Sequence, residues 1–447
     1  MGSVGTWSRV AVATVLLAAC TSPGARPTGT ERASPSTAAV PTGAAPTTAA
    51  QTAATARTSL PDEVCPSGGG VAFADGLTAT VVDIPGSDLR IRAAVYPHPD
   101  HEGNPWSQWG QGLATADGRF FSAIGDHLGA DGNSYLYEFD PDTGVLAEIG
   151  DLRTLVGAEP GEWGHGKIHA QMVAGPCGEF YAAGYWGSRR GIDGYEGGSL
   201  LRIDPDRRMI ENLGVPIPGH GIPSLASWPA GGLLYGEAAD PGAETGSNTG
   251  PFFVYDVVSR EVIYTFDDPS HTGFRSIAVD AAGRAYFGVG DGVLGVYEPE
   301  TNDLGDTVNI PGEVLRAAAT VGERVVAVSD RPAVFFTIGG DGTITELGPA
   351  RGYTTSIAGT GPLYSVPGAH GDGYDMGTPV IALDPDSGSE SVLVELAPLI
   401  EEALGLRLGG TYGVVQAGDR LFLSLNAGGP ADRDPFGEVV LVEVTLP

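Results

Sequence analysis

The chain has 447 residues and carries 55 Asp and Glu against 24 Lys and Arg, which gives a formal net charge of −31. A folded part this acidic, with no basic cluster, argues against nucleic acid and against an anionic lipid surface as its ligands. The charge suits an extracytoplasmic protein, and a generally acidic proteome explains it equally well.

The first residues have the features of an export signal. Arg9 supplies a positive charge, and residues 10–19 form an apolar run that is too short for a membrane-spanning helix, which needs about 20 residues. The run ends in Leu-Ala-Ala-Cys at residues 17–20, which resembles a bacterial lipobox. The resemblance implies that residues 1–20 are a lipoprotein signal peptide and that Cys20 is lipidated, with palmitate, and anchors the chain outside the cytoplasm. The alternative is an ordinary signal peptide cleaved at an Ala-x-Ala site.

Residues 21–64 consist mainly of Thr, Ala, Pro, Ser and Gly. A segment with so few large apolar side chains buries too little surface to offset its chain entropy, so we expect a disordered tether. Residues 65–447 then form the folded part. This length exceeds a typical single core, but it suits one large repeat protein.

A weak repeat recurs seven times in the folded part, from about residue 110 onward. Its apolar second strands begin at residues 119, 179, 233, 284, 324, 362 and 420. Its third strands often end near an acidic turn, as in Phe139-Asp140-Pro141. Repeats of roughly 40–50 residues with four strands each are typical of β-propellers. We predict an all-β fold, a seven-bladed β-propeller of four-stranded antiparallel blades.

The ring must close for the last blade to be complete, because an unpaired strand edge is unfavourable. The chain ends after three strands of the last blade, so we expect residues 79–84 to supply the fourth strand of the blade formed by residues 411–444. Residues 89–96 have no assigned place, and helices are expected at 152–157 and 397–406. The expected inner strands are 108–114, 168–174, 224–228, 274–279, 314–320, 354–358 and 411–416.

Two cysteines remain apart from Cys20. In an oxidising compartment an even pair far apart in sequence indicates a disulfide, so we predict a bond between Cys65 and Cys177. It would tie the end of the tether to the rim of the second blade. Two free thiols are the alternative.

All eight histidines fall in two sets of loops that share one face of a propeller, those entering the inner strands and those joining second to third strands. They are His98, His101, His127, His165, His169, His220, His271 and His370. Histidine favours loops in general, so chance would give the same distribution. We interpret this face as the functional one, because propellers commonly bind ligands around the end of the central channel.

The segment 164–171 carries the strongest signal on this face. In an extended chain His165, Lys167 and His169 share one side. Lys167 is the only lysine among the 24 basic residues, and an ammonium group here could neutralise a carboxylate or act as a base if desolvated. A stray codon is the alternative explanation.

The next two blades repeat the theme with His220, His271 and Arg275, and we predict that these act with His165, Lys167 and His169 as catalytic residues. One hypothesis is a general acid and base pair with Arg275 holding a carboxylate. Another is that His165, His169, His220 and His271 bind a divalent metal, because imidazoles suit Zn, Mn or Cu. The sequence specifies no cofactor beyond this alternative.

Aromatic and basic side chains crowd the same face. Flat rings and guanidinium groups suit sugars and carboxylates, so we predict substrate binding there. Packing of the loops against each other is the alternative. The predicted substrate-binding residues are Trp106, Trp109, His127, Tyr185, Trp186, Arg189, Arg190 and Tyr374.

The blade pattern, as in Asp117-Gly118-Arg119 and Asp140-Pro141-Asp142, resembles the bacterial secreted propellers with NHL-like, quinoprotein-like or streptogramin-lyase-like repeats. Seven-bladed propeller polysaccharide lyases are similar in architecture, and they use His, Tyr and Arg beside the channel. The resemblance implies a surface-anchored protein that acts on an extracellular glycan, as a lyase directed at uronates. The alternative is a non-catalytic propeller that binds a glycan, another small ligand or a protein. We expect a monomer that reaches the membrane only through its lipid anchor.

Overall fold

The computed structural model describes residues 65, 69–103, 105–185, 195–239, 250–268, 271, 277–368, 373–428 and 436–447, except for the side chains of 374 and 375. Within this part of the chain, no helix has both the length and the apolar character that a membrane span requires. Several predictions fall outside these residues. They concern residues 1–20 and 21–64, Cys20, Trp186, Arg189, Arg190, Arg275, His370 and the side chain of Tyr374.

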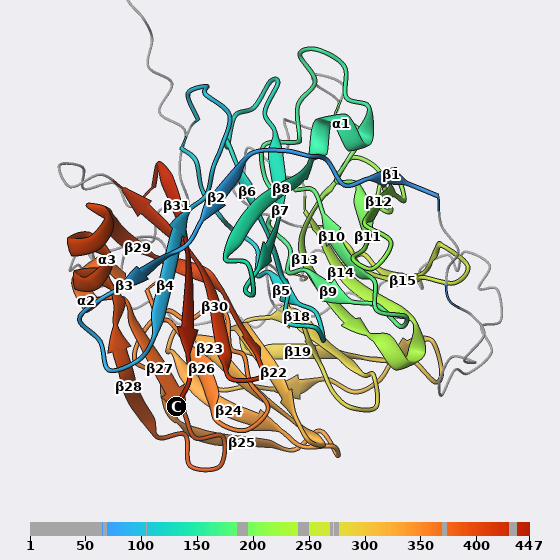
Figure 1. The fold of residues 1–447 in the computed structure, drawn as a ribbon. Coiled ribbons are helices and arrows are strands. Elements are labelled where there is room, and N and C mark those ends of the chain that lie inside the picture. Colours follow the sequence, from blue (N-terminus) through green and yellow to red (C-terminus); the bar gives the residue numbers. More distant parts are fainter. Residues whose placement is uncertain are drawn as a thin grey trace, which may run out of the picture. The chain divides into compact units, whose positions relative to one another are not determined.

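Seven small antiparallel sheets form a ring, which confirms the seven-bladed propeller (Figure 1). Blade 1 contains β5 (Leu113–Ala114), β6 (Phe120–Gly125), β7 (Ser134–Asp140) and β8 (Val145–Asp151). Blade 2 contains β9 (Val173–Ala174), β10 (Phe180–Ala183), β11 (Leu200–Asp204) and β12 (Met209–Asn212). Blade 3 contains β13 (Gly221–Trp228), β14 (Leu233–Ala239), β15 (Phe252–Asp256) and β16 (Glu261–Phe266).

The second half of the ring follows the same order. Blade 4 contains β17 (Ala278–Val279), β18 (Ala285–Gly290), β19 (Val293–Glu298), β20 (Asp303–Leu304) and β21 (Val308–Asn309). Blade 5 contains β22 (Val314–Val321), β23 (Arg324–Asp330), β24 (Val334–Ile338) and β25 (Ile344–Pro349). Blade 6 contains β26 (Leu363–Ser365), β27 (Pro379–Leu383) and β28 (Glu390–Glu395). Blade 7 contains β29 (Arg407–Ala417), β30 (Arg420–Gly428), β31 (Glu438–Thr445), β4 (Ile91–Val95) and β3 (Val82–Ile84).

Blade 6 departs from the four-stranded pattern. Its predicted inner strand, residues 354–358, is reduced to one bridge between Ala358 and Tyr364. The side chains of Thr355 and Ser356 instead donate hydrogen bonds to the carbonyls of Thr411 and Val414 in blade 7, at 3.2 and 3.3 Å. This segment therefore follows the neighbouring blade more than its own.

The predicted closing strand was wrong. β4 lies in residues 89–96, for which we had predicted no place. It pairs with β31, so that Ile91 lies opposite Val444. The predicted segment 79–84 divides, because β2 (Thr78–Thr80) joins β8 of blade 1 while β3 lies outside β4. Burial explains the choice, since the side chain of Ile91 is 1% exposed whereas that of Val82 is 49% exposed. An N-terminal strand does close the ring, as expected.

Short helices lie outside the sheets. α1 (Leu152–Val156) and α3 (Leu396–Leu404) confirm both predicted helices, and α2 (Gly373–Met376) and the 3-10 turn η1 (Pro229–Gly231) were not predicted. Asp151 caps α1 by accepting a hydrogen bond from the amide of Thr154, at 2.9 Å. Leu396 and Ile400 are the buried residues of α3, which packs beside blade 7.

Adjacent blades share apolar cores. Phe120 of blade 1 stacks on Phe422 of blade 7 with ring centroids 5.1 Å apart, and Phe252 of blade 3 stacks on Phe287 of blade 4 at 3.8 Å. All four rings are at most 1% exposed. The blades are therefore held mainly by burial of side chains between them.

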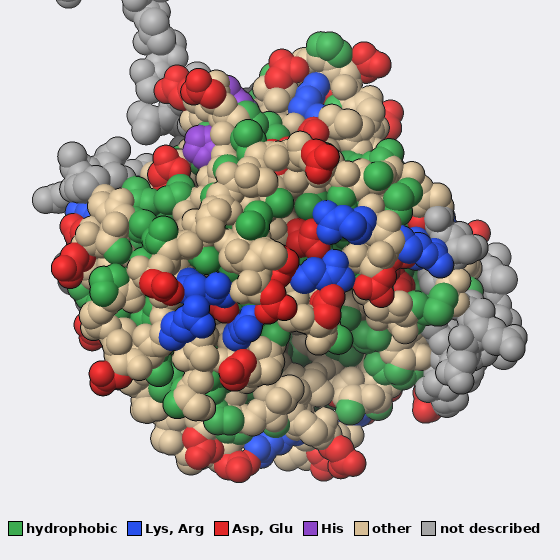
Figure 2. Space-filling view, in the orientation of Figure 1, with side chains coloured by type: hydrophobic (Ala, Val, Ile, Leu, Met, Phe, Trp, Pro, Cys, Tyr) green, Lys and Arg blue, Asp and Glu red, His purple; other side chains and the backbone are tan. Residues whose placement is uncertain are grey.

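Arginines that begin second strands join neighbouring blades at the opposite end from the histidines. Arg119 donates to the carbonyl of Pro205 in blade 2 at 3.1 Å, and Arg284 to that of Gly340 in blade 5 at 2.6 Å. Arg324 pairs with Asp386 of blade 6. On the face shown in Figure 2, basic side chains lie among acidic ones, consistent with many local ion pairs.

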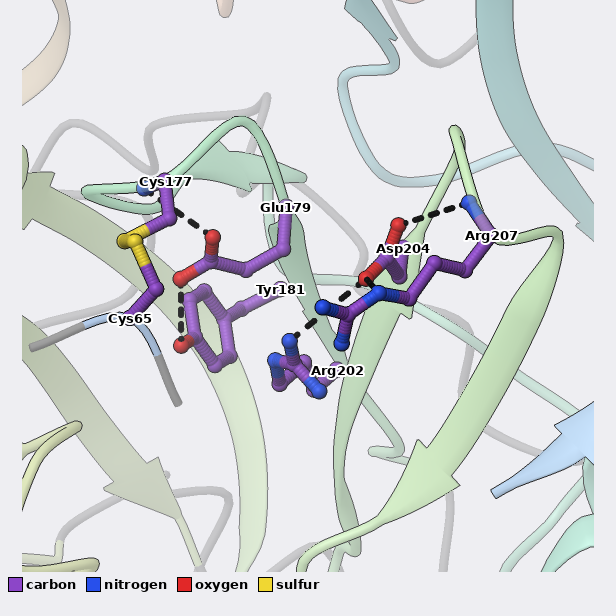
Figure 3. Close-up of a disulfide and its surroundings, with 7 residues drawn as sticks. All are labelled: Cys65, Cys177, Glu179, Tyr181, Arg202, Asp204 and Arg207. Carbon is purple, nitrogen blue, oxygen red and sulfur yellow. Dashed lines mark hydrogen bonds and ion pairs between the residues drawn. A yellow bond between two sulfur atoms is a disulfide. The ribbon is translucent and has the colours of Figure 1, made fainter. Parts of the chain in front are cut away.

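Cys65 and Cys177 are bonded, which agrees with the sequence prediction (Figure 3). Cys177 precedes β10, and its backbone amide donates to Glu179 at 3.0 Å, while Tyr181 donates to the other oxygen of Glu179 at 3.1 Å. Beyond Cys65, β1 (Val71–Ala72) pairs with β12 as an outer strand of blade 2. The start of the folded part is thus strapped across the outside of blade 2.

Candidate functional site

The candidate site lies on the face at which the inner strands begin, which we call the entry face. Second strands end on this face and third strands begin on it, so it also holds the loops between them. Each of the seven described histidines precedes an inner strand or follows a strand that ends here. The structure therefore places them on one face, as the sequence indicated.

Lys167 and Trp109 form the centre of this site. The two residues precede the inner strands of blades 2 and 1, which are joined where the amide of Met172 donates to the carbonyl of Gln111 at 2.8 Å. The ammonium nitrogen of Lys167 lies 3.6 Å from the centroid of the Trp109 ring and 5.6 Å from that of Tyr185. Lys167 is 5% exposed, and its ammonium group is placed for cation–π contact with these two rings.

Four further rings gather around Trp109. Its centroid lies 5.4 Å from that of His127 and 6.2 Å from that of His169, with each pair nearly parallel. Tyr412 and Phe436 stack on it from blade 7, at 4.9 and 5.5 Å. We did not predict the last two. Tyr412 stands at the start of an expected inner strand next to blade 1, which was an available signal, whereas nothing in the sequence marks Phe436.

The tautomer of His169 is fixed by a backbone group. Its Nδ1 lies 2.8 Å from the carbonyl oxygen of Pro223 at the start of blade 3. A carbonyl only accepts, so Nδ1 donates, and in the neutral ring Nε2 carries the lone pair. Nε2 is thus the unprotonated nitrogen of the neutral His169 ring.

The described contacts of His165 are with residues other than Lys167 and Trp109. Its Nε2 is 3.1 Å from a carboxylate oxygen of Glu162, and its carbonyl accepts from the hydroxyl of Ser134 at 2.8 Å. Burial lowers the pKa of His165 below its ordinary value, although Glu162 acts in the opposite direction. The neutral ring is therefore favoured near pH 7.

His220 and His271 form a second group around Gly250. The Nδ1 atom of His271 donates to the carbonyl of Gly250 at 2.5 Å. A side chain on Gly250 would meet the ring of His220, since an added Cβ would lie 3.0 Å from its Cδ2. The Nδ1 of His220 lies 3.0 Å from the carbonyl oxygen of Pro218. The structure thus brings these two predicted residues together.

A buried glutamate that we did not predict belongs to this second group. Glu237 of β14 is 0% exposed, accepts a hydrogen bond from the hydroxyl of Ser224 at 2.5 Å, and has a carboxylate oxygen 3.6 Å from Nε2 of His271. Burial acts to lower the pKa of His271, but Glu237, together with the Gly250 carbonyl and Asp267, raises it above its ordinary value. A charged residue inside the apolar second strand 233–239 was the available signal.

The segment 220–224 connects the two groups. Pro223 accepts from His169, and the next residue, Ser224, donates to Glu237. Tyr185 also packs here, since an added Cβ on Gly221 would lie 2.7 Å from its ring. The residues around Trp109 and His169 therefore include groups from blades 1, 2 and 3.

Trp106 takes a different place from the one predicted. It is 4% exposed and belongs to the core shared by blades 7 and 1, where His98 stacks on it at 4.4 Å and His101 lies at 5.0 Å. His98 is paired with Glu438, which raises its pKa. Trp106 thus supports the loop from within, and the structure offers no open ring face there.

No group of three or more His, Cys, Asp or Glu in the described part of the chain is arranged to hold a metal ion. The Nδ1 atoms of His169, His220 and His271 face backbone carbonyls, as the second nitrogen of a metal-binding imidazole commonly does. A metal shared by His165, His169, His220 and His271 stays a prediction, and we derive no step through one.

Comparison with known proteins supports the fold. No protein-family model matches the chain, and no curated protein does. A catalytically inactive virginiamycin B lyase from Staphylococcus aureus, solved with quinupristin, matches with a TM-score of 0.50 and 12% identity over 80% of this chain and 100% of that one. A streptogramin B lyase structure matches with a TM-score of 0.50 and 10% identity over 79% and 98%. The likeness is one of fold.

The chemistry must therefore come from this chain's own residues. A cation over an indole, an imidazole with a fixed tautomer and stacked rings together suit a ligand that combines negative charge with flat apolar faces. Sugar rings with a carboxylate have both properties.

Proposed function

We propose that the protein is a lipid-anchored extracytoplasmic lyase that cleaves a uronate-containing glycan by β-elimination. One observation carries the proposal: the Lys167 ammonium group and the His169 ring share the Trp109 indole, with the Nδ1 atom of His169 held by Pro223. This arrangement supplies a positive charge and a base within one site.

In the proposed reaction, Lys167 neutralises the substrate carboxylate and so acidifies the adjacent C5–H bond. Nε2 of His169 accepts that proton, the electron pair forms the C4–C5 double bond, and the C4–O bond breaks. The leaving oxygen takes up a proton and becomes a hydroxyl. Trp109 and Tyr185 provide the flat surfaces that orient the sugar ring.

The experiment is a cleavage assay with acidic glycans, in which a 4,5-unsaturated uronate absorbs in the near ultraviolet. His169→Ala should lower the rate by about 10²–10⁴, the usual effect of removing a catalytic base. His220→Ala should also abolish the signal, with little effect on melting temperature. His98→Ala is the matched control, since it removes an imidazole of the same face that is paired with Glu438.

A second candidate is a non-catalytic binding propeller. Its support is that the Nδ1 atoms of His169, His220 and His271 each contact a backbone carbonyl and that all three residues are at most 8% exposed. Such side chains can serve packing alone. Binding of an acidic glycan without product, unaffected by His169→Ala and His220→Ala, would establish this candidate and refute the lyase.

We also propose that Cys20 is lipidated and that the chain is a monomer at the cell surface. Labelling with radioactive palmitate in cells should depend on Cys20. A Cys20→Ala variant that still carries the label would refute the anchor without affecting the proposal for the entry face.

A further inference from the structure

The inner strands line an open cavity of about 210 Å³ in the central channel. Its lining residues include Val173, Ser227, Val279 and Thr320, each in the last residues of its inner strand. Inner strands begin on the entry face and end at the turns of the opposite face. The cavity therefore begins next to the layer of Trp109 and His169 and extends toward the opposite face.

Two glutamines line the inner part of this cavity. Gln111 precedes the inner strand of blade 1 and Gln171 that of blade 2. They lie at the same level, since the carbonyl of Gln111 accepts from the amide of Met172, the residue after Gln171, at 2.8 Å. Trp109 and His169 each stand two residues earlier, so they form the next layer toward the entry face.

Backbone groups fix how both carboxamides point. The Nε2 atom of Gln111 donates to the carbonyl of Val414 at 3.0 Å, and Oε1 of Gln171 accepts from the amide of Leu225 at 3.4 Å. A carbonyl cannot donate and an amide N–H cannot accept, so neither side chain can be flipped without losing its bond. Gln111 is left with an acceptor, Oε1, and Gln171 with a donor, Nε2.

The described lining is uncharged throughout. A carboxylate or an ammonium group in this space would meet no opposite charge among the described lining residues. Leu225, Ala278 and Ala317 supply apolar wall beside the two amides. At about 30 Å³ per molecule, the space equals that of roughly seven waters, which suits a small group but not a drug-sized ligand.

We propose that this cavity is a second binding site, separate from the entry-face site, for a small uncharged molecule or side chain that carries a carboxamide. The carboxamide would accept a hydrogen bond from Nε2 of Gln171 and donate one to Oε1 of Gln111. Its alkyl part would face the apolar wall. The site does not depend on whether the entry face is catalytic.

The test uses the full soluble chain carrying Cys20→Ser, labelled with ¹⁵N, and follows the side-chain NH₂ signals of Gln111 and Gln171 by NMR. Acetamide is the probe, and acetate is its charged counterpart of the same shape. Gln171→Glu keeps the acceptor for Leu225 but replaces the donor by an acceptor. Gln416→Glu is the matched control, because Gln416 bonds to Gly418 and is not among the residues that line the cavity.

We expect saturable shifts of both signals with acetamide in the parent chain and in Gln416→Glu, and at least about tenfold weaker binding in Gln171→Glu. Acetate should leave the signals in place. Gln171→Met, which removes the donor without adding charge, should also weaken binding and covers the case in which Gln171→Glu does not fold. Absence of a saturable shift, which would mean that the cavity holds only water, overturns the proposal. Equal binding of acetate, or full binding in both Gln171 variants, also overturns it.

Discussion

Removal of the Cys65–Cys177 disulfide should lower the free energy of unfolding by an amount that follows from the length of the loop it closes. The bond closes a loop of 112 residues. In the chain-entropy model a loop of this length stabilises the folded state by about 4.8 kcal/mol at 25 °C, which is an upper figure. The strap, which we define as the segment around β1 that crosses the outside of blade 2, makes few contacts of its own, because β1 is two residues long and Val71 is 54% exposed. Its main anchor is Phe73, which packs edge-on against Phe121 at 6.4 Å.

A strap with so few contacts can detach before the propeller unfolds, so the double variant C65S/C177S should lose about 2–4 kcal/mol of unfolding free energy and not the full figure. Urea unfolding followed by tryptophan fluorescence measures this loss, and the parent chain under reducing conditions should behave like the variant. Before reduction, a form with Cys20→Ser should show no titratable thiol. Two reactive thiols, or a loss below about 1 kcal/mol, would refute the argument.

Three other changes test the remaining structure. Glu443→Gln should lower the free energy of unfolding in urea by about 2–4 kcal/mol. The reason is that Glu443 is 2% exposed and accepts a hydrogen bond from Arg92 of the closing strand at 2.7 Å. A change within error would show that closure of the ring does not depend on this ion pair. His271 has a raised pKa, so the stability that it contributes is complete below about pH 6.5 and is lost as the pH rises through the higher folded value. His271→Gln should therefore flatten the fall of melting temperature with rising pH, and an unchanged profile would contradict the pairing with Glu237. By urea unfolding, Trp109→Ala should lower the free energy of unfolding by about 2–4 kcal/mol. Trp109→Phe should lower it by less than about 1.5 kcal/mol, because phenylalanine keeps a ring in the stack. Equal losses would show that the stacked rings do not stabilise this site.

The blade pattern was predictable because each second and third strand carries its own apolar run and turn. The closing strand was not, because residues 79–84 and 89–96 are both short stretches rich in apolar side chains, and either could complete the last blade. What separates them is burial beside β31, where Arg92 also contacts Glu443, 351 residues away. A single sequence gives no indication that two such distant residues meet.

On the entry face, too, part of the arrangement was predictable from the sequence. Lys167, His169 and Trp109 could be expected together because they precede neighbouring inner strands, whose register sets His169 level with Trp109. The carboxylate of Glu237 could not be placed, since a charge in an apolar strand also occurs at exposed edges. Its role becomes visible only when Ser224 and His271 are seen beside it.

The two proposals for the entry face differ in whether Nε2 of His169 accepts a proton from the ligand. Binding of an acidic sugar requires only the charge of Lys167 and the surface of Trp109, and both are held rigidly by stacked rings. Elimination also requires that Nε2 takes a proton while Pro223 keeps Nδ1 as a donor, which it does equally well for the imidazolium. His169→Gln can still donate a hydrogen bond but cannot act as a base. If it retains binding and loses the unsaturated product, the imidazole acts as a base, and if no variant of His169 changes anything but stability, its position beside Trp109 is one of packing.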